Sequence, residues 1–170
     1  MKKSVGLLVM TEFDGILHAI LHRRGVWNHD KDRRQHWAGA YQVTAHGGIK
    51  LDEQVETVTL LREAGEELGT ETALMIAIVM ADGRKVPKIN EHRTDEEEVT
   101  TFAIGLRSSF LKKVKLNASS GGLLPISINN LNKLVPIKPE WKEQNPPENV
   151  IAMFENDIRA VRSTNTPFRL

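Results

Sequence analysis

The chain has 170 residues, 23 Lys and Arg against 22 Asp and Glu, a net charge of +1 and no cysteine. Its length fits a single domain over residues 1–170, and a hydrophobic share of 40% is that of a folded globular protein. The balanced charge predicts no nucleic-acid partner, and the lack of cysteine excludes disulfides, thiolate metal sites and a cysteine nucleophile. Because no apolar run approaches the roughly 18 residues of a membrane helix, we expect no membrane partner and a cytoplasmic location.

The N-terminal segment has the pattern of a β-hairpin. Two apolar runs, residues 4–10 and 16–22, flank the pair Asp14-Gly15, which is a strong signal of a tight turn. The polar and basic residues 23–35 predict a loop, a kind of segment that often carries binding residues.

A short strand, a glycine pair and a helix are predicted next. Residues 37–45 have a strand-like pattern that ends at Gly47-Gly48, where glycine permits backbone angles that other residues avoid. Residues 52–68 predict a helix, and Gly69 predicts its end.

Apolar runs and turn signals predict strands and one helix in the rest of the chain. In order, these are a buried strand over residues 72–81, a turn at Asp82-Gly83, a strand over 98–106, a flexible break over 119–122, a strand over 123–128, a proline-containing linker over 136–147 and an amphipathic helix over 150–161. The helix is expected because its apolar residues recur at helical spacing after two prolines.

The predicted helix over residues 52–68 carries three glutamates on one face. Glu63, Glu66 and Glu67 fall within an arc of about 100°, because spacings of three and four residues bring side chains together on a helix. An apolar face that we expect to pack against a sheet lies opposite and consists of Val58, Leu61, Ala64, Gly65 and Leu68. Crowded hard oxygen ligands favour Mg²⁺ or Mn²⁺, and the alternative is a solvated acidic surface.

The residues around these glutamates resemble the Nudix box: a glycine, five residues, a glutamate, seven residues, then Arg-Glu, an aliphatic residue, any residue, Glu-Glu, any residue, a glycine and an aliphatic residue. The matching positions are Gly48, Arg62, Glu63, Glu66, Glu67 and Gly69. Three positions depart, since Gln54 replaces the first glutamate, Ala64 is small for an aliphatic position and Thr70 replaces the last aliphatic residue. Gln54 lacks the charge that would pair with the box arginine, and Glu53 and Glu56 are candidate substitutes.

The resemblance implies an α/β fold, a Nudix-like α/β/α sandwich with a mixed β-sheet. It also implies a hydrolase that uses Mg²⁺, or Mn²⁺ in its place, to cut the diphosphate linkage of a nucleoside diphosphate derivative of the NTP, nucleotide-sugar or ADP-ribose type. Because many family members dimerise, it leaves a homodimer open. By analogy with the family, the metal ligands are Glu66, Glu67, Glu63 and the Gly47 carbonyl, and the catalytic set is Glu63, Glu66 and Arg62.

Two glutamates outside the box are candidates for further metal ligands. Glu96 and Glu98 lie where the predicted strand over residues 98–106 begins, and alternate residues of an extended segment face the same way. The alternative is a solvated charged turn.

The residues predicted to contact substrate are Arg23, Arg24, His46 and Gly48. Guanidinium groups match the oxygen geometry of phosphate, and solvated surface arginines are the alternative. His46 is either a phosphate or metal contact or a hydrogen-bonded structural histidine. Trp27 and Trp37 either stack on a base or belong to the core.

A binding module and an isomerase are the other hypotheses. Gln54 favours, as the second hypothesis, a Nudix-fold nucleotide-binding or regulatory module with little or no hydrolysis. Residues 21–24 and 37–44 also resemble the isopentenyl diphosphate isomerase branch of the superfamily. That branch requires a cysteine before the box glycine, where this chain has Gly47, so we do not expect isomerase chemistry.

Overall fold

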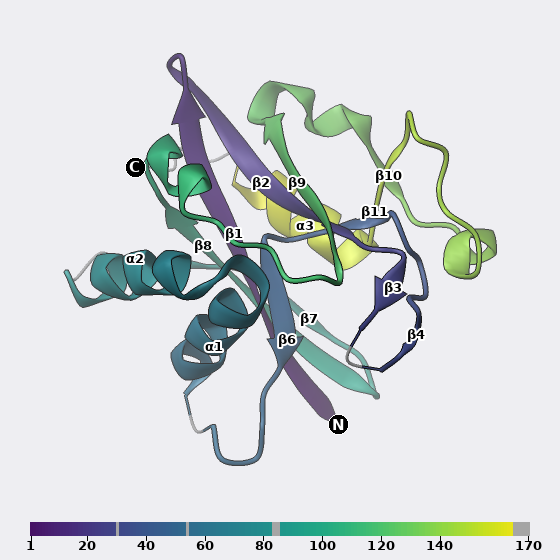
Figure 1. Ribbon diagram of the computed structural model, residues 1–170, viewed down its shortest axis with the longest axis horizontal. Coiled ribbons are helices and arrows are strands. Elements are labelled where there is room, and N and C mark those ends of the chain that lie inside the picture. Colours follow the sequence, from purple (N-terminus) through teal and green to yellow (C-terminus); the bar gives the residue numbers. More distant parts are fainter. Residues whose placement is uncertain (30, 54, 83–85, 165–170) are drawn as a thin grey trace.

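The computed structural model describes residues 1–29, 31–53, 55–82 and 86–164. Within these residues, a mixed nine-stranded sheet has the order β10-β11-β5-β2-β1-β8-β7, with β6 paired to β1 and β9 paired to β2 (Figure 1). Its strands are β1 (Lys2–Phe13), β2 (Ile16–Arg24), β5 (Tyr41–Gln42), β6 (Ala45–Gly48), β7 (Lys88–Arg93), β8 (Glu97–Gly105), β9 (Ser120–Ser127), β10 (Leu134–Pro136) and β11 (Ile151–Met153). A separate two-stranded ribbon pairs β3 (Trp27–Asn28) with β4 (Arg33–Arg34).

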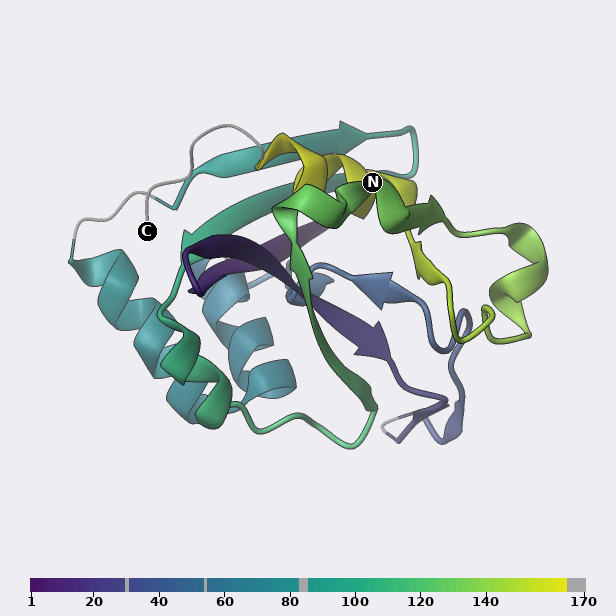
Figure 2. The ribbon, with the colours of Figure 1, turned by 90° about the horizontal axis from the view of Figure 1, so that it is seen from above.

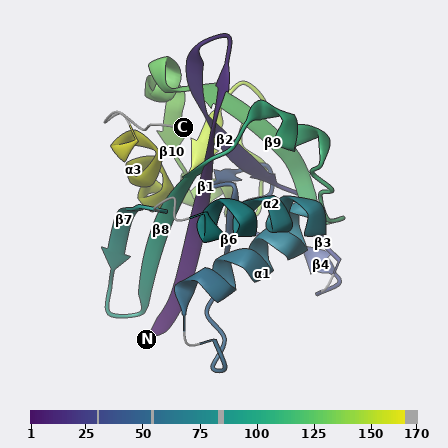
Figure 3. The ribbon, with the colours of Figure 1, turned by 90° about the vertical axis from the view of Figure 1, so that its left-hand side faces the viewer.

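Helices cover both faces of this sheet. The helices α1 (Glu56–Leu68) and α2 (Thr70–Ala81) lie on one face and α3 (Glu155–Ser163) lies on the other, as Figures 2 and 3 show. Three short 3₁₀ helices complete the described elements: η1 (Ser108–Lys112), η2 (Ile128–Lys133) and η3 (Pro139–Lys142). The predicted α/β fold with a mixed sheet is therefore confirmed. No helix in the described part of the chain is long and apolar enough to cross a membrane.

The central strand β1 contributes to two hydrophobic cores because its residues alternate between the two faces. Val5, Leu7 and Val9 pack in the core that contains residues of α1 and α2. Leu8 and Met10 pack in the core that contains residues of α3. Both faces of β1 are buried, which accounts for an apolar run without polar alternation.

The predicted N-terminal hairpin is confirmed. β1 and β2 pair antiparallel with Phe13 opposite Ile16, so Asp14 and Gly15 form a two-residue turn. Both turn residues have positive φ, 50° and 75°, as the tightest hairpin turns require. The predicted strand over residues 98–106 is also confirmed, as β8, which runs parallel to β1.

The predicted strand over residues 72–81 is wrong, because these residues belong to helix α2. When nearly every residue of a segment is apolar, its hydrophobic pattern repeats neither every two residues, as in a strand, nor every 3.6, as in a helix. The pattern then does not distinguish the two. Gly69 adopts a φ of 90° between α1 and α2 and allows a sharp change of direction. Thr72 and Ile76, one helical turn apart, are the residues of α2 that this arrangement buries.

Several predicted boundaries are also wrong. The strand expected over residues 37–45 is reduced to Tyr41–Gln42, and the glycine pair lies within β6. The acidic helix begins at Glu56 rather than residue 52, and its end at Gly69 is confirmed. On this helix Leu60 is buried, whereas Val58, assigned to the apolar face, is 51% exposed.

The C-terminal region differs for a tertiary reason. Residues 151–153 form β11, which lies between β10 and β5, so the last helix begins only at Glu155. The break expected over residues 119–122 instead contains the start of β9, which pairs with β2. The box position Gln54 and the predicted turn residue Gly83 lie outside the described residues.

Candidate functional site

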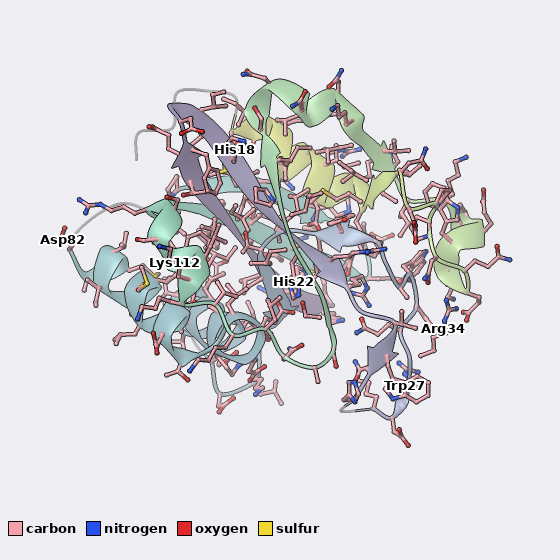
Figure 4. The ribbon with its side chains drawn as sticks, turned by 45° about the horizontal axis from the view of Figure 1, so that its top comes forward. His18, His22, Trp27, Arg34, Asp82 and Lys112 are labelled. Atoms are coloured by element: carbon pink, nitrogen blue, oxygen red, sulfur yellow. The ribbon has the colours of Figure 1, made fainter. Side chains whose placement is uncertain are left out.

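The last two turns of α1 line a cavity of about 630 Å³. Glu63, Glu66 and Glu67 lie in its wall, so the structure brings together the three glutamates that their spacing placed on one face. In Figure 4, His22 lies near the middle of the molecule, and Trp27 marks the β3–β4 ribbon at its edge. The rest of the lining comes from elements other than α1 and is called the opposite wall: His22, Arg24, Asn28, His29, Gln35, Gln42, Asn117, Ala118 and Ser119.

Arg62 neutralises and orients three carboxylates. Its Nη1 donates to Glu63 Oε1 at 2.6 Å and to Glu66 Oε2 at 3.2 Å. Its Nε and Nη2 bind the two oxygens of Glu53 at 2.5 and 3.2 Å, and Nη2 also donates to the Gly48 carbonyl at 2.9 Å. Of the two substitutes expected for the charge missing at position 54, the structure places Glu53 on the arginine.

Charge and burial set the pKa values of these groups apart. The hydrogen bond from Arg62, with further bonds from the Lys50 amide and the Thr59 hydroxyl, lowers the pKa of Glu53 to about 2. The same contact raises the pKa of Arg62. Burial raises the pKa of Glu63, although Arg62 opposes this effect. Glu63 is therefore a stronger proton acceptor than an ordinary carboxylate, which suits a general base.

Gly47 makes room for the Glu63 carboxyl group. Gly47 lies in β6 opposite Val5 of β1, and a Cβ atom built on it would lie 1.8 Å from Glu63 Cδ. Any side chain at this position would displace the glutamate. The cysteine that isomerase chemistry requires at this position is therefore incompatible with Glu63 as placed here.

Glu67 is held by His46, which the sequence analysis named, and by His22, which it did not single out as a site residue. Its Oε2 accepts a hydrogen bond from the His46 backbone N–H at 3.2 Å and lies 3.5 Å from His22 Nδ1. His22 is buried on β2, and its Nε2 lies 2.7 Å from Ser120 Oγ. The available signal was alternation, since His22 and Arg24 are two residues apart on one strand and face the same side.

Arg24 and Arg23 lie in different environments, although they were predicted as a pair. Arg24 lines the cavity, where Nη1 lies 3.3 Å from Gln42 Oε1 and Nε lies 3.3 Å from the His36 carbonyl oxygen. Burial lowers the pKa of Arg24, and the negative charges of Glu67 and Asp157 oppose this shift. Arg23 projects from the other face of β2, where its Nε donates to the Gly39 carbonyl.

Comparisons with known proteins agree with this architecture. A Nudix hydrolase from M. smegmatis, RenU, superimposes with a TM-score of 0.59 over 99% of this chain and 89% of that one, at 12% sequence identity. The chain has the Nudix fold. An Ap4A hydrolase from C. elegans matches with a TM-score of 0.50 and 11% identity over 76% of this chain and 82% of that one. A MutT/nudix family protein from Enterococcus faecalis matches with a TM-score of 0.50 and 11% identity over 74% of this chain, which spans only 43% of that protein. No family model and no curated protein matches the sequence.

The two glutamates predicted outside the Nudix box do not reach its cavity. Glu98 lies 3.8 Å from Lys3 Nζ in a second cavity of about 250 Å³, which Glu53 and Glu56 also line. Glu96 is exposed in the turn before β8. Neither residue lines the cavity that Glu63, Glu66 and Glu67 share.

The remaining predicted contacts take structural roles in this arrangement. His46 contributes its backbone N–H to Glu67, and Gly48 contributes its carbonyl to the box arginine. The half-buried Trp37 ring packs edge to face against Phe154 at 5.6 Å and belongs to neither of the two hydrophobic cores. Trp27 is 42% exposed, so stacking on a base stays a prediction.

The donor chemistry of the Nudix box fits a hard divalent cation. Glu63, Glu66 and Glu67 supply only carboxylate oxygens to the cavity, and these are the ligands that Mg²⁺ and Mn²⁺ prefer. Among the described residues, however, no group of three or more His, Asp or Glu side chains is already gathered closely enough to hold a metal ion. Glu63 and Glu66 both pair with Arg62. The positive charge of Arg62 therefore already balances part of the negative charge that a metal ion would otherwise neutralise.

Proposed function

We propose that this protein is a metal-dependent Nudix hydrolase that cuts the diphosphate linkage of a nucleoside diphosphate derivative. One observation carries the proposal: a single cavity is lined both by the three glutamates of the Nudix box and by the half-buried guanidinium of Arg24. Carboxylates suit Mg²⁺, and a guanidinium suits the oxygens of phosphate. In a diphosphate with a bound divalent cation, the cation would face the glutamates and the phosphate oxygens would face Arg24.

Each group at the site has a role in this proposal. Glu66 and Glu67, with Glu63 and the Gly47 carbonyl, would hold Mg²⁺ or Mn²⁺. The bound ion would neutralise diphosphate charge and lower the pKa of an attacking water. Glu63, which is either one of these ligands or the base, would in the second role accept a proton from that water, and Arg62 orients its carboxylate. Arg24 binds phosphate oxygens.

A substrate panel tests the proposal. We would incubate the protein with NTPs, nucleotide sugars, ADP-ribose and Ap4A, with Mg²⁺ or Mn²⁺ and with chelator, and identify the products by mass. We expect metal-dependent release of a nucleoside monophosphate or diphosphate from at least one compound. Turnover that EDTA does not reduce, or no turnover across the panel, would contradict the proposal.

A nucleotide-binding module with little hydrolysis is the second candidate. The observation that favours it is the engagement of Glu63 and Glu66 by Arg62, without a gathered metal cluster in the described residues. The variant Gln54→Glu separates the two functions. If it creates hydrolysis that the wild type lacks, while nucleotide affinity measured by calorimetry stays the same, the protein is a binding module. If the wild type already hydrolyses a panel compound, the module is excluded.

A further inference from the structure

We infer that His22 is a positioning residue that orients Glu67 through its Nδ1–H group. The inference rests on the proposed function, because Glu67 matters for chemistry only if the Nudix box binds a metal. His22 lies on β2, outside the Nudix box.

His22 is a buried polar side chain with one unpartnered nitrogen. Its side chain is 5% exposed, and it lines the cavity beside Arg24. Nε2 lies 2.7 Å from Ser120 Oγ, whereas Nδ1 is buried without a hydrogen-bond partner. The carboxylate oxygen Glu67 Oε2 lies 3.5 Å from Nδ1, longer than a normal hydrogen bond. A buried donor without an acceptor is unfavourable, so a small movement that closes this gap is favoured.

The neighbours of His22 indicate which nitrogen carries the proton. Ser120 Oγ accepts a hydrogen bond from the Gly122 N–H at 3.0 Å. Its hydroxyl can still either donate to His22 Nε2 or accept from it, so the group beside Nδ1 decides the tautomer. That group is the Glu67 carboxylate, which only accepts, and it favours a proton on Nδ1 with Nε2 accepting from Ser120. A neutral imidazole that accepts at Nε2 has its proton at Nδ1. This assignment, made from the hydrogen-bond network, directs an N–H group at Glu67.

Glu67 needs a partner of its own because Arg62 cannot serve it. Glu67 follows Arg62 by five residues, about 140° further around the helix, whereas Glu66 lies one turn away on the same side. Arg62 accordingly pairs with Glu63 and Glu66, which lie on its own side of the helix. His22 and the His46 N–H both approach Oε2 of Glu67, which leaves Oε1 for the cavity.

Orienting a ligand carboxylate in this way changes metal affinity. Groups that fix the ligands of a metal typically alter its affinity about 10- to 100-fold when they are removed. We therefore expect His22→Leu, which keeps the volume but removes the donor, to weaken Mn²⁺ binding about 10-fold or more. His22→Asn, whose amide nitrogen can take the place of Nδ1, should restore affinity to within about threefold of wild type.

The experiment titrates Mn²⁺ into the full chain and measures free ion by electron paramagnetic resonance. The matched control is His18→Leu, the same change on the same strand, at a residue whose Nδ1 contacts the Ile16 carbonyl outside the cavity. This control should bind Mn²⁺ as wild type does, and thermal unfolding of all variants shows whether each is folded. Long-range ¹H–¹⁵N spectra of wild type should show the Nδ1–H tautomer, and Ser120→Ala should shift that spectrum.

The outcomes separate this inference from the proposed function. If His22→Leu binds Mn²⁺ as tightly as wild type, or His22→Asn is as weak as His22→Leu, His22 only fills space and the inference fails, whatever the substrate panel shows. An Nε2–H tautomer would also overturn it. If wild type binds Mn²⁺ and the His22 effect appears but no compound is cut, only the proposed hydrolysis fails. If wild type binds no Mn²⁺, both fail.

Discussion

The two walls of the cavity are built in different ways. The acidic wall comes from one stretch of eight residues, 62–69, in which helical spacing alone aligns the three glutamates. The opposite wall combines parts of β2, the β3–β4 ribbon, β5 and residues 117–119, which are far apart in the sequence. The spacing of residues in a single helix is therefore enough to cluster like charges. A wall with the complementary charge forms only when strands and loops from distant parts of the sequence come together.

The difference has a consequence for how each wall tolerates change. Most of the acidic wall is held locally, because Arg62 and its three carboxylate partners all lie within residues 53–66, and only Glu67 is held from a distance, by His22 and His46. The opposite wall depends on β2 pairing with β5 and β9. Substitutions on the acidic wall should therefore alter chemistry with little change in the fold, and the predictions below test this contrast.

The largest effect is expected from the acidic wall. Glu66→Gln and Glu67→Gln each remove one hard anionic ligand and should lower kcat at least about 100-fold and weaken Mn²⁺ binding. Glu71→Gln is the matched control, since Glu71 lies on α2, is about half exposed and pairs with Lys113. Steady-state kinetics with a compound from the panel provide the measurement. If both cavity variants keep the metal dependence of wild type, Glu66 and Glu67 are not metal ligands.

On the opposite wall, the two neighbouring arginines should differ. Arg24→Ala should lower kcat/KM about 10- to 100-fold, because the half-buried guanidinium that we propose binds phosphate is lost. Arg23→Ala should change kcat/KM less than about threefold, since Arg23 faces Gly39 on the other side of β2. Equal losses in the two variants would show that the arginines act through general charge and that this wall has no defined phosphate contact.

The adjacent glycines of β6 should also differ, this time in stability. A Cβ atom on Gly47 meets the Glu63 carboxyl group, whereas one on Gly48 has only the Lys3 carbonyl oxygen nearby, at 3.9 Å. Gly47→Ala should therefore lower the free energy of unfolding by about 1–3 kcal/mol, as overpacking typically does. Gly48→Ala should change it by less than about 1 kcal/mol. Chemical denaturation measures both, and the reverse order would mean that Glu63 does not occupy the space beside Gly47.

The smallest effect is expected from Glu53, at the outer end of the acidic wall. Because Arg62 lowers the pKa of Glu53 from the ordinary 4.5 to about 2, this carboxylate stabilises the folded state fully above pH 4.5. The stabilisation is lost as the pH falls towards 2, where the carboxyl becomes protonated. Glu53→Gln should therefore be less stable than wild type near neutral pH, with a gap that closes on acidification. Denaturant unfolding at several pH values tests this, and a gap that is constant with pH would exclude the Arg62 pair as its cause.

Local periodicity determined a definite part of this protein in advance. The hairpin at Asp14-Gly15, the end of the first helix at Gly69 and the common face of Glu63, Glu66 and Glu67 all depend on residues close in sequence. The interactions that decide such features span a few residues, so their spacing carries enough information.

Tertiary structure alone decided the rest. Residues 72–81 became a helix and residues 151–153 a strand, because packing against distant elements selected between conformations that the local pattern left equivalent. The same long-range contacts placed Arg24 rather than Arg23 in the cavity and brought His22 next to Glu67. Sequence spacing specifies which side chains share a face of one element, but only the pairing of strands and the packing of layers determines which faces meet.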